Sequence, residues 1–269
     1  MPSTLAGFAS AAPAGNTHAM ANRLHTDEHA GGDPPIVLLH GLGVGGVSWQ
    51  RVVPLLTPRH RVLVPDLPGF GRSPSLPAGV PYSVPALSDA VERELDERAL
   101  DAPVIAGNSL GGWVALELAR RGRASALALV AAAGLSSPPE IAWTVVLNEA
   151  LRAGAKLLQP LWPRTDGEPL WPRIGRDLAT SPGFEPTLAW MAANQPATGL
   201  DEVRCPALVV WGAGDPLLPV WHASRFAQAI PGARLRLVAG GHLAMLEAPQ
   251  AVAEAVLDVA AGDGSLVAA

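Results

Sequence analysis

A serine stands in a glycine-flanked turn at residues 107–111, which read G-N-S-L-G. The apolar run 104–106 before it is typical of a buried strand, and residues 112–118 after it are typical of a helix. A G-x-S-x-G nucleophile motif requires this strand–turn–helix context, because the sharp turn lifts the serine hydroxyl above the sheet edge. Glycines two residues either side remove side chains that would clash there. The pattern predicts Ser109 as a nucleophile; the competing interpretation is a glycine-rich loop without chemistry.

Two further turns supply the partners that such a serine needs. Asp215 follows the apolar run 207–212, where its carboxylate could orient an imidazole and stabilise it once protonated. His242 lies in the turn A-G-G-H-L at 239–243, after the apolar run 235–238. The order of serine, aspartate and histidine along the chain is the one that hydrolases with this motif use. The pattern therefore predicts His242 as the general base and Asp215 as the acid that orients it.

Each of these assignments has a structural alternative. Asp215 could instead cap the helix that follows it, and His222, on that predicted helix, competes as the base but is assigned a structural role. Cys205 precedes a proline and an apolar run, so it is interpreted as a buried structural thiol. Because it is the sole cysteine, an intramolecular disulfide is impossible. Four other histidines lie outside any strand-to-helix turn: His18, His25, His29 and His60.

The elements that must position these residues alternate along the chain. Short, nearly continuous apolar runs predict parallel strands buried on both faces, and helix-like stretches separate them. This alternation predicts a doubly wound, mostly parallel α/β sheet. The predicted strands are 36–40, 62–66, 103–107, 126–133, 207–212 and 235–238, and the predicted helices are 47–56, 84–100, 110–121, 220–229 and 250–260.

One interval breaks the alternation. About seventy residues separate the strand that ends near Ala133 from the one that begins near Ala207, which is too long for a structureless loop. We interpret the interval as an inserted helical lid. The weak pattern at 21–34 fits a short hairpin. The predicted organisation is a mobile N-terminal arm at 1–20, a core at 21–135 and 201–269, and a lid at 136–200.

With these motifs in place, the sequence resembles the α/β-hydrolase family, in its serine-nucleophile esterase and C–C hydrolase-like branch. Residues 40–43, H-G-L-G, resemble the family's oxyanion loop, and residues 66–73, D-L-P-G-F-G-R-S, resemble a structural turn that follows the next strand. The resemblance implies that His40 braces the oxyanion loop and that Asp66 is not the catalytic acid. It also implies a triad of Ser109, Asp215 and His242, with an oxyanion site formed by the backbone N–H groups of Leu42 and Leu110.

Composition narrows the range of partners. Hydrophobic residues make up 49% of the chain and charged residues 16%, which favours a folded domain over disorder. The formal net charge is −5, without a dense Lys/Arg run, so no nucleic-acid partner is expected. The longest apolar stretch, near 124–135, is too short to span a membrane, and the N-terminus lacks the pattern of a signal peptide. A cytoplasmic protein that binds a small molecule, without a metal or organic cofactor, is expected.

The expected reaction is cleavage of a small apolar or aromatic ester through an acyl-enzyme. A C–C bond hydrolase acting on a vinylogous diketone, an acyltransferase and a cofactor-free perhydrolase would use the same residues and stay open. A ligand-binding protein on the same fold is the non-enzymatic alternative. The serine at position 109 disfavours the epoxide hydrolases and haloalkane dehalogenases of the family, which carry an aspartate there.

The interval 136–200 is expected to set the substrate. Its apolar side chains suggest an apolar or aromatic acyl partner, although packing onto the core would explain any single tryptophan. Its arginines could bind a carboxylate, with solvated surface charge as the default. The apolar candidates are Trp143, Val146, Leu147, Leu157, Leu158, Trp162, Trp171, Trp190 and Met191, and the arginines are Arg152, Arg164, Arg173 and Arg176.

Overall fold

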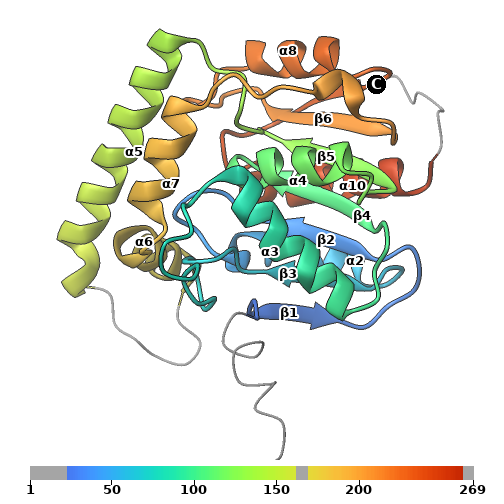
Figure 1. The fold of residues 1–269 in the computed structure, drawn as a ribbon, viewed down its shortest axis with the longest axis horizontal. Coiled ribbons are helices and arrows are strands. Elements are labelled where there is room, and N and C mark those ends of the chain that lie inside the picture. Colours follow the sequence, from blue (N-terminus) through green and yellow to red (C-terminus); the bar gives the residue numbers. More distant parts are fainter. Residues whose placement is uncertain (1–22, 162–168, 263–269) are drawn as a thin grey trace, which may run out of the picture.

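A seven-stranded sheet forms the centre of the molecule (Figure 1) in a computed structural model that describes residues 23–161 and 169–262. The predicted arm at 1–20 lies outside the described residues. The strand order is β1-β3-β2-β4-β5-β6-β7, and every neighbouring pair is parallel except β1 with β3. The prediction of a mostly parallel α/β sheet is confirmed. The strands are β1 (Thr26–His29), β2 (Ile36–Leu39), β3 (Val62–Pro65), β4 (Val104–Asn108), β5 (Ala126–Val130), β6 (Ala207–Gly212) and β7 (Arg234–Val238).

Helices cover both faces of the sheet, which is why its strands read as continuous apolar runs. Successive side chains of a strand point to opposite faces, so β2 divides its residues between two buried clusters. Val37 and Leu39 pack in one cluster with α3 and α4 (green-blue to green, Figure 1), whereas Ile36 and Leu38 pack in the other with α10. Both clusters consist of buried apolar side chains, as expected for a doubly wound sheet.

The longer helices of the core lie where the sequence predicts them. The predicted helix 47–56 is wrong as a single element, because the chain forms a 3₁₀ turn and a separate four-residue helix there, with Pro54 in the first turn of the second piece. Proline lacks the N–H that a continuous helix needs at that point. The core helices are η1 (Gly46–Trp49), α2 (Val53–Leu56), α3 (Val84–Glu97), α4 (Leu110–Arg120), η3 (Leu200–Glu202), α8 (Trp221–Ala229), α9 (Ala244–Glu247) and α10 (Pro249–Ala260).

In the described part of the segment 21–34, which begins at residue 23, the one strand is β1, and it does not form the expected hairpin. β1 pairs antiparallel with β3 rather than with β2, with Thr26 opposite Pro65 and His29 opposite Val62. β1 therefore forms the edge of the sheet. Its burial pattern runs from half-buried at Thr26 to exposed at His29, and this partial burial explains why the segment has no clear apolar period.

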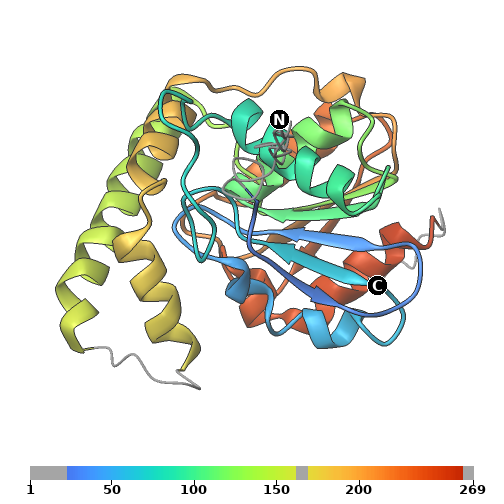
Figure 2. The ribbon, with the colours of Figure 1, turned by 60° about the horizontal axis from the view of Figure 1, so that its bottom comes forward.

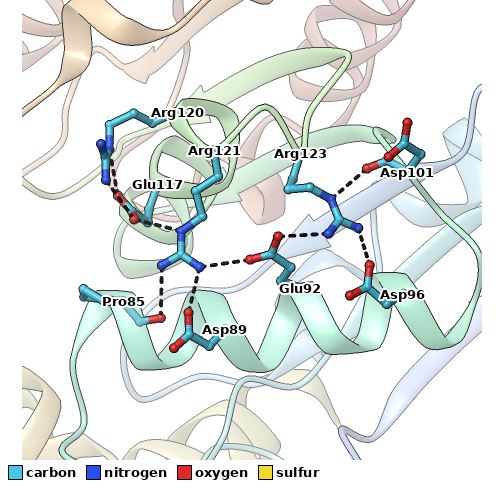
Figure 3. A network of polar contacts seen from close by, with 9 residues as sticks. All are labelled: Pro85, Asp89, Glu92, Asp96, Asp101, Glu117, Arg120, Arg121 and Arg123. Carbon is cyan, nitrogen blue, oxygen red and sulfur yellow. Dashed lines mark hydrogen bonds and ion pairs between the residues drawn. The ribbon is translucent and has the colours of Figure 1, made fainter.

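A network of ion pairs fastens α3 to the C-terminal end of α4 (Figure 3). Arg121 contacts Glu117, Asp89 and Glu92, and Arg123 contacts Glu92 and Asp96. Exposed pairs of this kind contribute about 0–1 kcal/mol each. Their main effect is positional, since they hold the end of the helix whose other end begins directly after Ser109.

The interval between β5 and β6 is helical in its described part. Its helices are α5 (Pro138–Leu158), η2 (Gln159–Leu161), α6 (Leu170–Thr180) and α7 (Phe184–Ala193). Figures 1 and 2 show α6 and α7 alongside α5, beyond one end of the sheet. No helix of the described ranges combines the length and the apolar character that a membrane crossing needs.

Candidate active site

The turn that carries Ser109 is held in an unusual backbone conformation. Ser109 has φ +52° and ψ −115°, a combination that non-glycine residues rarely adopt. Its N–H donates to Val130 O (3.1 Å), and its carbonyl accepts from Gly112, Trp113 and Ala133. These hydrogen bonds hold the strained turn between β4, β5 and α4. Backbone strain at a single non-glycine residue is a feature of functional sites.

The two flanking glycines are required by close backbone contacts. A Cβ at Gly107 would lie 2.2 Å from Gly111 O, and a Cβ at Gly111 would lie 2.4 Å from Leu39 O. Both contacts are with backbone atoms, which cannot rotate away. The glycine spacing of the motif is therefore a consequence of how tightly α4 returns against β2 and β4.

Asp215 and His242 are hydrogen-bonded to each other. His242 Nδ1 lies 2.8 Å from Asp215 Oδ2, and the Asp215 side chain is fully buried. The other oxygen, Oδ1, accepts the backbone N–H groups of Leu217 (2.8 Å) and Leu218 (2.9 Å). An ionised carboxylate only accepts, so Nδ1 of His242 carries the proton and Nε2 of the neutral ring is left as the basic nitrogen. Asp215 thus stabilises its own loop and orients the imidazole at the same time.

A hydrogen bond joins the loop of His242 to the turn of Ser109. Asn108 Nδ2 donates to His242 O (3.0 Å) and to Val130 O (3.1 Å). On the other side, Gly241 N–H donates to Glu247 Oε2 (2.7 Å) on α9. Asn108 and Glu247 were not singled out from the sequence as positioning residues. The position of Asn108 inside the G-N-S-L-G motif was the sequence signal that could have indicated its positioning role.

His40 braces the loop 40–43, which is the predicted oxyanion loop. His40 is fully buried; its Nδ1–H donates to Gly41 O (2.8 Å), and its Nε2 accepts the N–H of Leu67 (2.8 Å). Burial lowers the pKa of His40, despite the nearby carboxylate of Asp66. The ring is therefore a neutral bridge between two loops.

The two residues predicted to donate to an oxyanion come from the loop after β2 and from the start of α4. Leu42 lies in the braced loop 40–43 and lines the same cavity as Ser109. Leu110 is the first residue of α4, with its side chain in the core. A backbone N–H in the first turn of a helix has no partner within the helix, which leaves the Leu110 N–H available to a ligand.

Asp66 has the structural role that was expected of it. Its Oδ1 accepts Gly46 N–H (2.6 Å), and its Oδ2 accepts Arg72 N–H (2.9 Å). A Cβ at Gly71 would lie 2.4 Å from the carboxyl group, so the turn closes tightly around it. Asp66 therefore fixes the loops that follow β2 and β3.

A cavity of about 920 Å³ joins the predicted catalytic residues to the inserted helices. Ser109 and His242 line it from the core, together with Leu42. From the inserted helices come Trp143, Leu147, Leu151, Trp171, Ile174 and Met191. The cavity is thus bounded by turns at the carboxyl ends of the strands on one side and by apolar helical side chains on the other, a setting suited to a small apolar ligand.

The other apolar residues of the insertion have different environments. Trp190 packs against Trp113, with ring centroids 5.6 Å apart, whereas Val146, Leu157 and Leu158 are exposed. Trp162 and Arg164 lie outside the described residues.

The N-terminal part of α5 is anchored to α8 through Glu140. Trp221 Nε1 and Arg225 Nη1 each donate to its carboxylate at 2.7 Å. Burial raises the pKa of Glu140, but the hydrogen bonds from Arg225, Ser137 and Trp221 together outweigh burial and lower the pKa of this carboxyl group. His222 is buried between the rings of Trp211 and Trp221, and its Nε2 lies 3.4 Å from Glu140 Oε1. The structural role expected of His222 fits this position.

The default expectation of a solvated charge is wrong for Arg152. It is 8% exposed, and its guanidinium carbon lies 4.5 Å from the centre of the Phe184 ring. Its Nη1 is 3.1 Å from Glu185 Oε1, without hydrogen-bond geometry. The side chain packs α5 onto α7, and only the tertiary arrangement of these helices buries it.

Metal ligation has no candidate site in residues 23–161 and 169–262. No three His, Cys, Asp or Glu side chains gather there in a way that could hold an ion.

Several known hydrolases are similar to this chain. The model of the alpha/beta hydrolase family matches residues 36–255. A pimeloyl-[acyl-carrier protein] methyl ester esterase from Aromatoleum aromaticum is 34% identical over 262 residues, covering 85% of this chain and 99% of that protein. A 2-hydroxy-6-oxononadienedioate/2-hydroxy-6-oxononatrienedioate hydrolase from Cupriavidus pinatubonensis is 30% identical over 269 residues, covering 88% and 90%. Among solved structures, a hydrolase from Pseudomonas aeruginosa PA01 matches with a TM-score of 0.74 at 27% identity, covering 88% of this chain and 93% of that one.

Proposed function

Because the chain belongs to the alpha/beta hydrolase family, we propose that it is a serine hydrolase that cleaves a small apolar or aromatic ester through an acyl-enzyme. The observation that carries the proposal is the 2.8 Å hydrogen bond between Asp215 and His242, in a loop that borders the same cavity as Ser109. A relative named as a methyl ester esterase supports the choice of an ester.

The proposed mechanism assigns a role to each residue of the predicted site. His242 takes the Ser109 proton during attack on the ester carbonyl and passes it to the leaving alcohol. Asp215 keeps the proton on Nδ1 and stabilises the imidazolium that forms. The N–H groups of Leu42 and Leu110 donate to the oxyanion, and each such donor contributes about 3 kcal/mol in other hydrolases. Water, activated by His242, then releases the acyl group and regenerates the serine.

Charge in the cavity favours an ester over the C–C bond alternative. Among the described residues that line the cavity, Glu247 is the one with an acidic side chain. The relative named as a 2-hydroxy-6-oxononadienedioate/2-hydroxy-6-oxononatrienedioate hydrolase takes a dioate, which carries two carboxylates. A carboxylate beside the ligand would oppose a dianionic substrate. We therefore place neutral esters first and keep C–C hydrolysis as the second candidate.

A fluorophosphonate probe tests the proposal against a ligand-binding function. We expect the probe to label Ser109, and we expect Ser109→Ala to abolish both labelling and the hydrolysis of p-nitrophenyl esters. Ser136→Ala is the matched control, because Ser136 lines the same cavity without belonging to the proposed triad. Folded wild-type protein that neither reacts with the probe nor cleaves esters would refute the proposal and favour the binding protein.

A further inference from the structure

The outer side of α5 is apolar and exposed. Figures 1 and 2 show α6 and α7 on one side of α5, so the other side of this helix faces away from the rest of the molecule. A row of five exposed residues follows it, which we call the α5 seam: Trp143, Val146, Ala150, Ala153 and Leu157. The exposed fraction is 52% for Trp143, 64% for Val146 and 78% for Leu157. Contiguous apolar surface of this kind marks a site of interaction.

The α5 seam has the spacing of a coiled coil. Its members follow one another after three, four, three and four residues, the alternation that places apolar side chains where two helices meet. The buried residues of α5 are others, namely Asn148, Arg152 and Ala155. A surface helix ordinarily turns its apolar side inward and its polar side to water. In α5 two of the three buried residues are polar, and the seam is left as a surface for a second helix.

One edge of the α5 seam carries two opposite charges. Glu149 and Lys156 are seven residues apart, each directly before a residue of the seam, and both are exposed. Charges at such flanking positions pair between the helices of a coiled coil and set their orientation. A twofold axis perpendicular to two helices brings this edge of one beside the same edge of the other, so each Glu149 would lie near a Lys156. A parallel pair would instead bring it beside the opposite edge, where Leu147 and Gly154 carry no charge.

We propose that the α5 seam binds the same seam of a second copy of this chain, as an antiparallel helix pair about a twofold axis between residues 151 and 152. In this register Ala150 of one copy faces Ala153 of the other, and Val146 faces Leu157. The alanines at the centre allow the helices to approach closely, and the larger side chains pack on either side of them. A twofold dimer requires a surface that is its own complement. The inference does not depend on the proposed function.

The charges beside the α5 seam do not suit a lipid surface. Helices that lie on membranes carry several Lys or Arg residues on their polar side, whereas the edge of the seam carries one acid and one base. Two seams of this length bury about 1,000 Å² in total, which is near the lower limit of specific interfaces. We therefore expect a reversible dimer with a Kd between about 10 and about 100 μM.

Sedimentation velocity of the full chain, from about 5 to about 500 μM, tests the dimer. We expect the weight-average mass to rise from that of one chain towards that of two. Ala150→Glu places a charge at the centre of the seam and should keep the protein monomeric over the whole range. Ala189→Glu is the matched control, because Ala189 is exposed on α7, outside the seam, and this variant should dimerise like wild type. Thermal melts at about 5 μM, where all three proteins are monomeric, show whether they are equally folded.

An exchange of charges tests the antiparallel arrangement. Glu149→Lys and Lys156→Glu should each weaken the dimer about fivefold, since each replaces two symmetric attractions by repulsions. Lys156 also lies 3.7 Å from Glu185 of its own chain, so the single variant at this position has an effect within the chain as well. The double variant restores the attraction only between copies, and we expect it to return the Kd to within about twofold of wild type.

Four outcomes would overturn the inference. Three concern self-association: a wild-type chain that is monomeric at about 500 μM, an Ala150→Glu protein that still dimerises, and a double variant without recovery. The fourth is cosedimentation of a monomeric wild-type chain with phosphatidylcholine vesicles, which would assign the α5 seam to a lipid surface instead.

Discussion

Two carboxyl groups meet where the inserted helix α6 packs against the core. Asp66, in the turn after β3, and Asp177, on α6, both border Gly45: a Cβ placed there would lie 3.0 Å from Asp66 Oδ1 and 3.2 Å from Asp177 Oδ2. Asp66 receives two backbone N–H groups. Burial, followed by the charge of Asp66, raises the pKa of Asp177 from 3.8 to about 6. Three arginines oppose this increase without cancelling it: Arg72, Arg173 and Arg176.

We expect Asp177→Asn to stabilise the protein at neutral pH. The folded state holds the proton of Asp177 more tightly than the unfolded chain, so it binds more protons between about pH 4 and pH 6, and stability falls as pH rises through that range. The difference between 3.8 and about 6 corresponds to about 3 kcal/mol. Because Asp177 is only half-buried, we expect a gain of about 2–3 kcal/mol for the asparagine variant above pH 7, and a gain below about 1 kcal/mol at pH 4.

Urea unfolding, followed by tryptophan fluorescence at pH 4, 5, 6 and 7.5, measures both the size of the gain and its pH dependence. Asp101→Asn is the matched control, since Asp101 is exposed and offers its backbone carbonyl, not its carboxylate, to Arg123. An Asp177→Asn protein that is no more stable than wild type at pH 7.5, or whose gain is equal at pH 4 and pH 7.5, would refute the reasoning.

Three other substitutions test neighbouring parts of the structure. Asp215→Asn should lower kcat by about 10⁴ while leaving the fold intact, because the amide favours the wrong tautomer of the base; near-normal turnover would place the acid elsewhere. His40→Ala should lower the free energy of unfolding by about 3–5 kcal/mol in urea titrations, since it opens a cavity and leaves the buried N–H of Leu67 unpaired; a loss below about 1 kcal/mol would contradict the bracing role. Arg152→Met should keep or raise stability by about 1 kcal/mol, because Met preserves packing on Phe184 and removes a buried, poorly paired charge; a loss above about 2 kcal/mol would show that the cation itself stabilises the helix contact.

The sequence predicted the sheet well because its strands are buried on both faces. Each of β2, β3, β4, β5 and β6 is fully buried along its length, and continuous apolar runs are the resulting signal. The edge strand β1 was missed as a partner of β3, because partial burial leaves no such run. The short helix α9 was also missed, since four residues carry too little periodicity to be recognised.

What the sequence determined by itself is the local backbone at the predicted catalytic turns. The glycine spacing around Ser109 permits one tight turn between a strand and a helix, and the runs before Asp215 and His242 end at the same edge of the sheet. Parallel strands bring such turns together whatever the rest of the chain does.

Tertiary structure alone decided what surrounds those turns. Whether Arg152 is buried and whether Asp177 meets Asp66 depend on how the helices of the insertion pack against one another and on the core. These contacts join residues far apart in sequence, and neither spacing nor composition encodes them. Burial and pairing, which set the free energy of a polar group, are properties of the packed molecule.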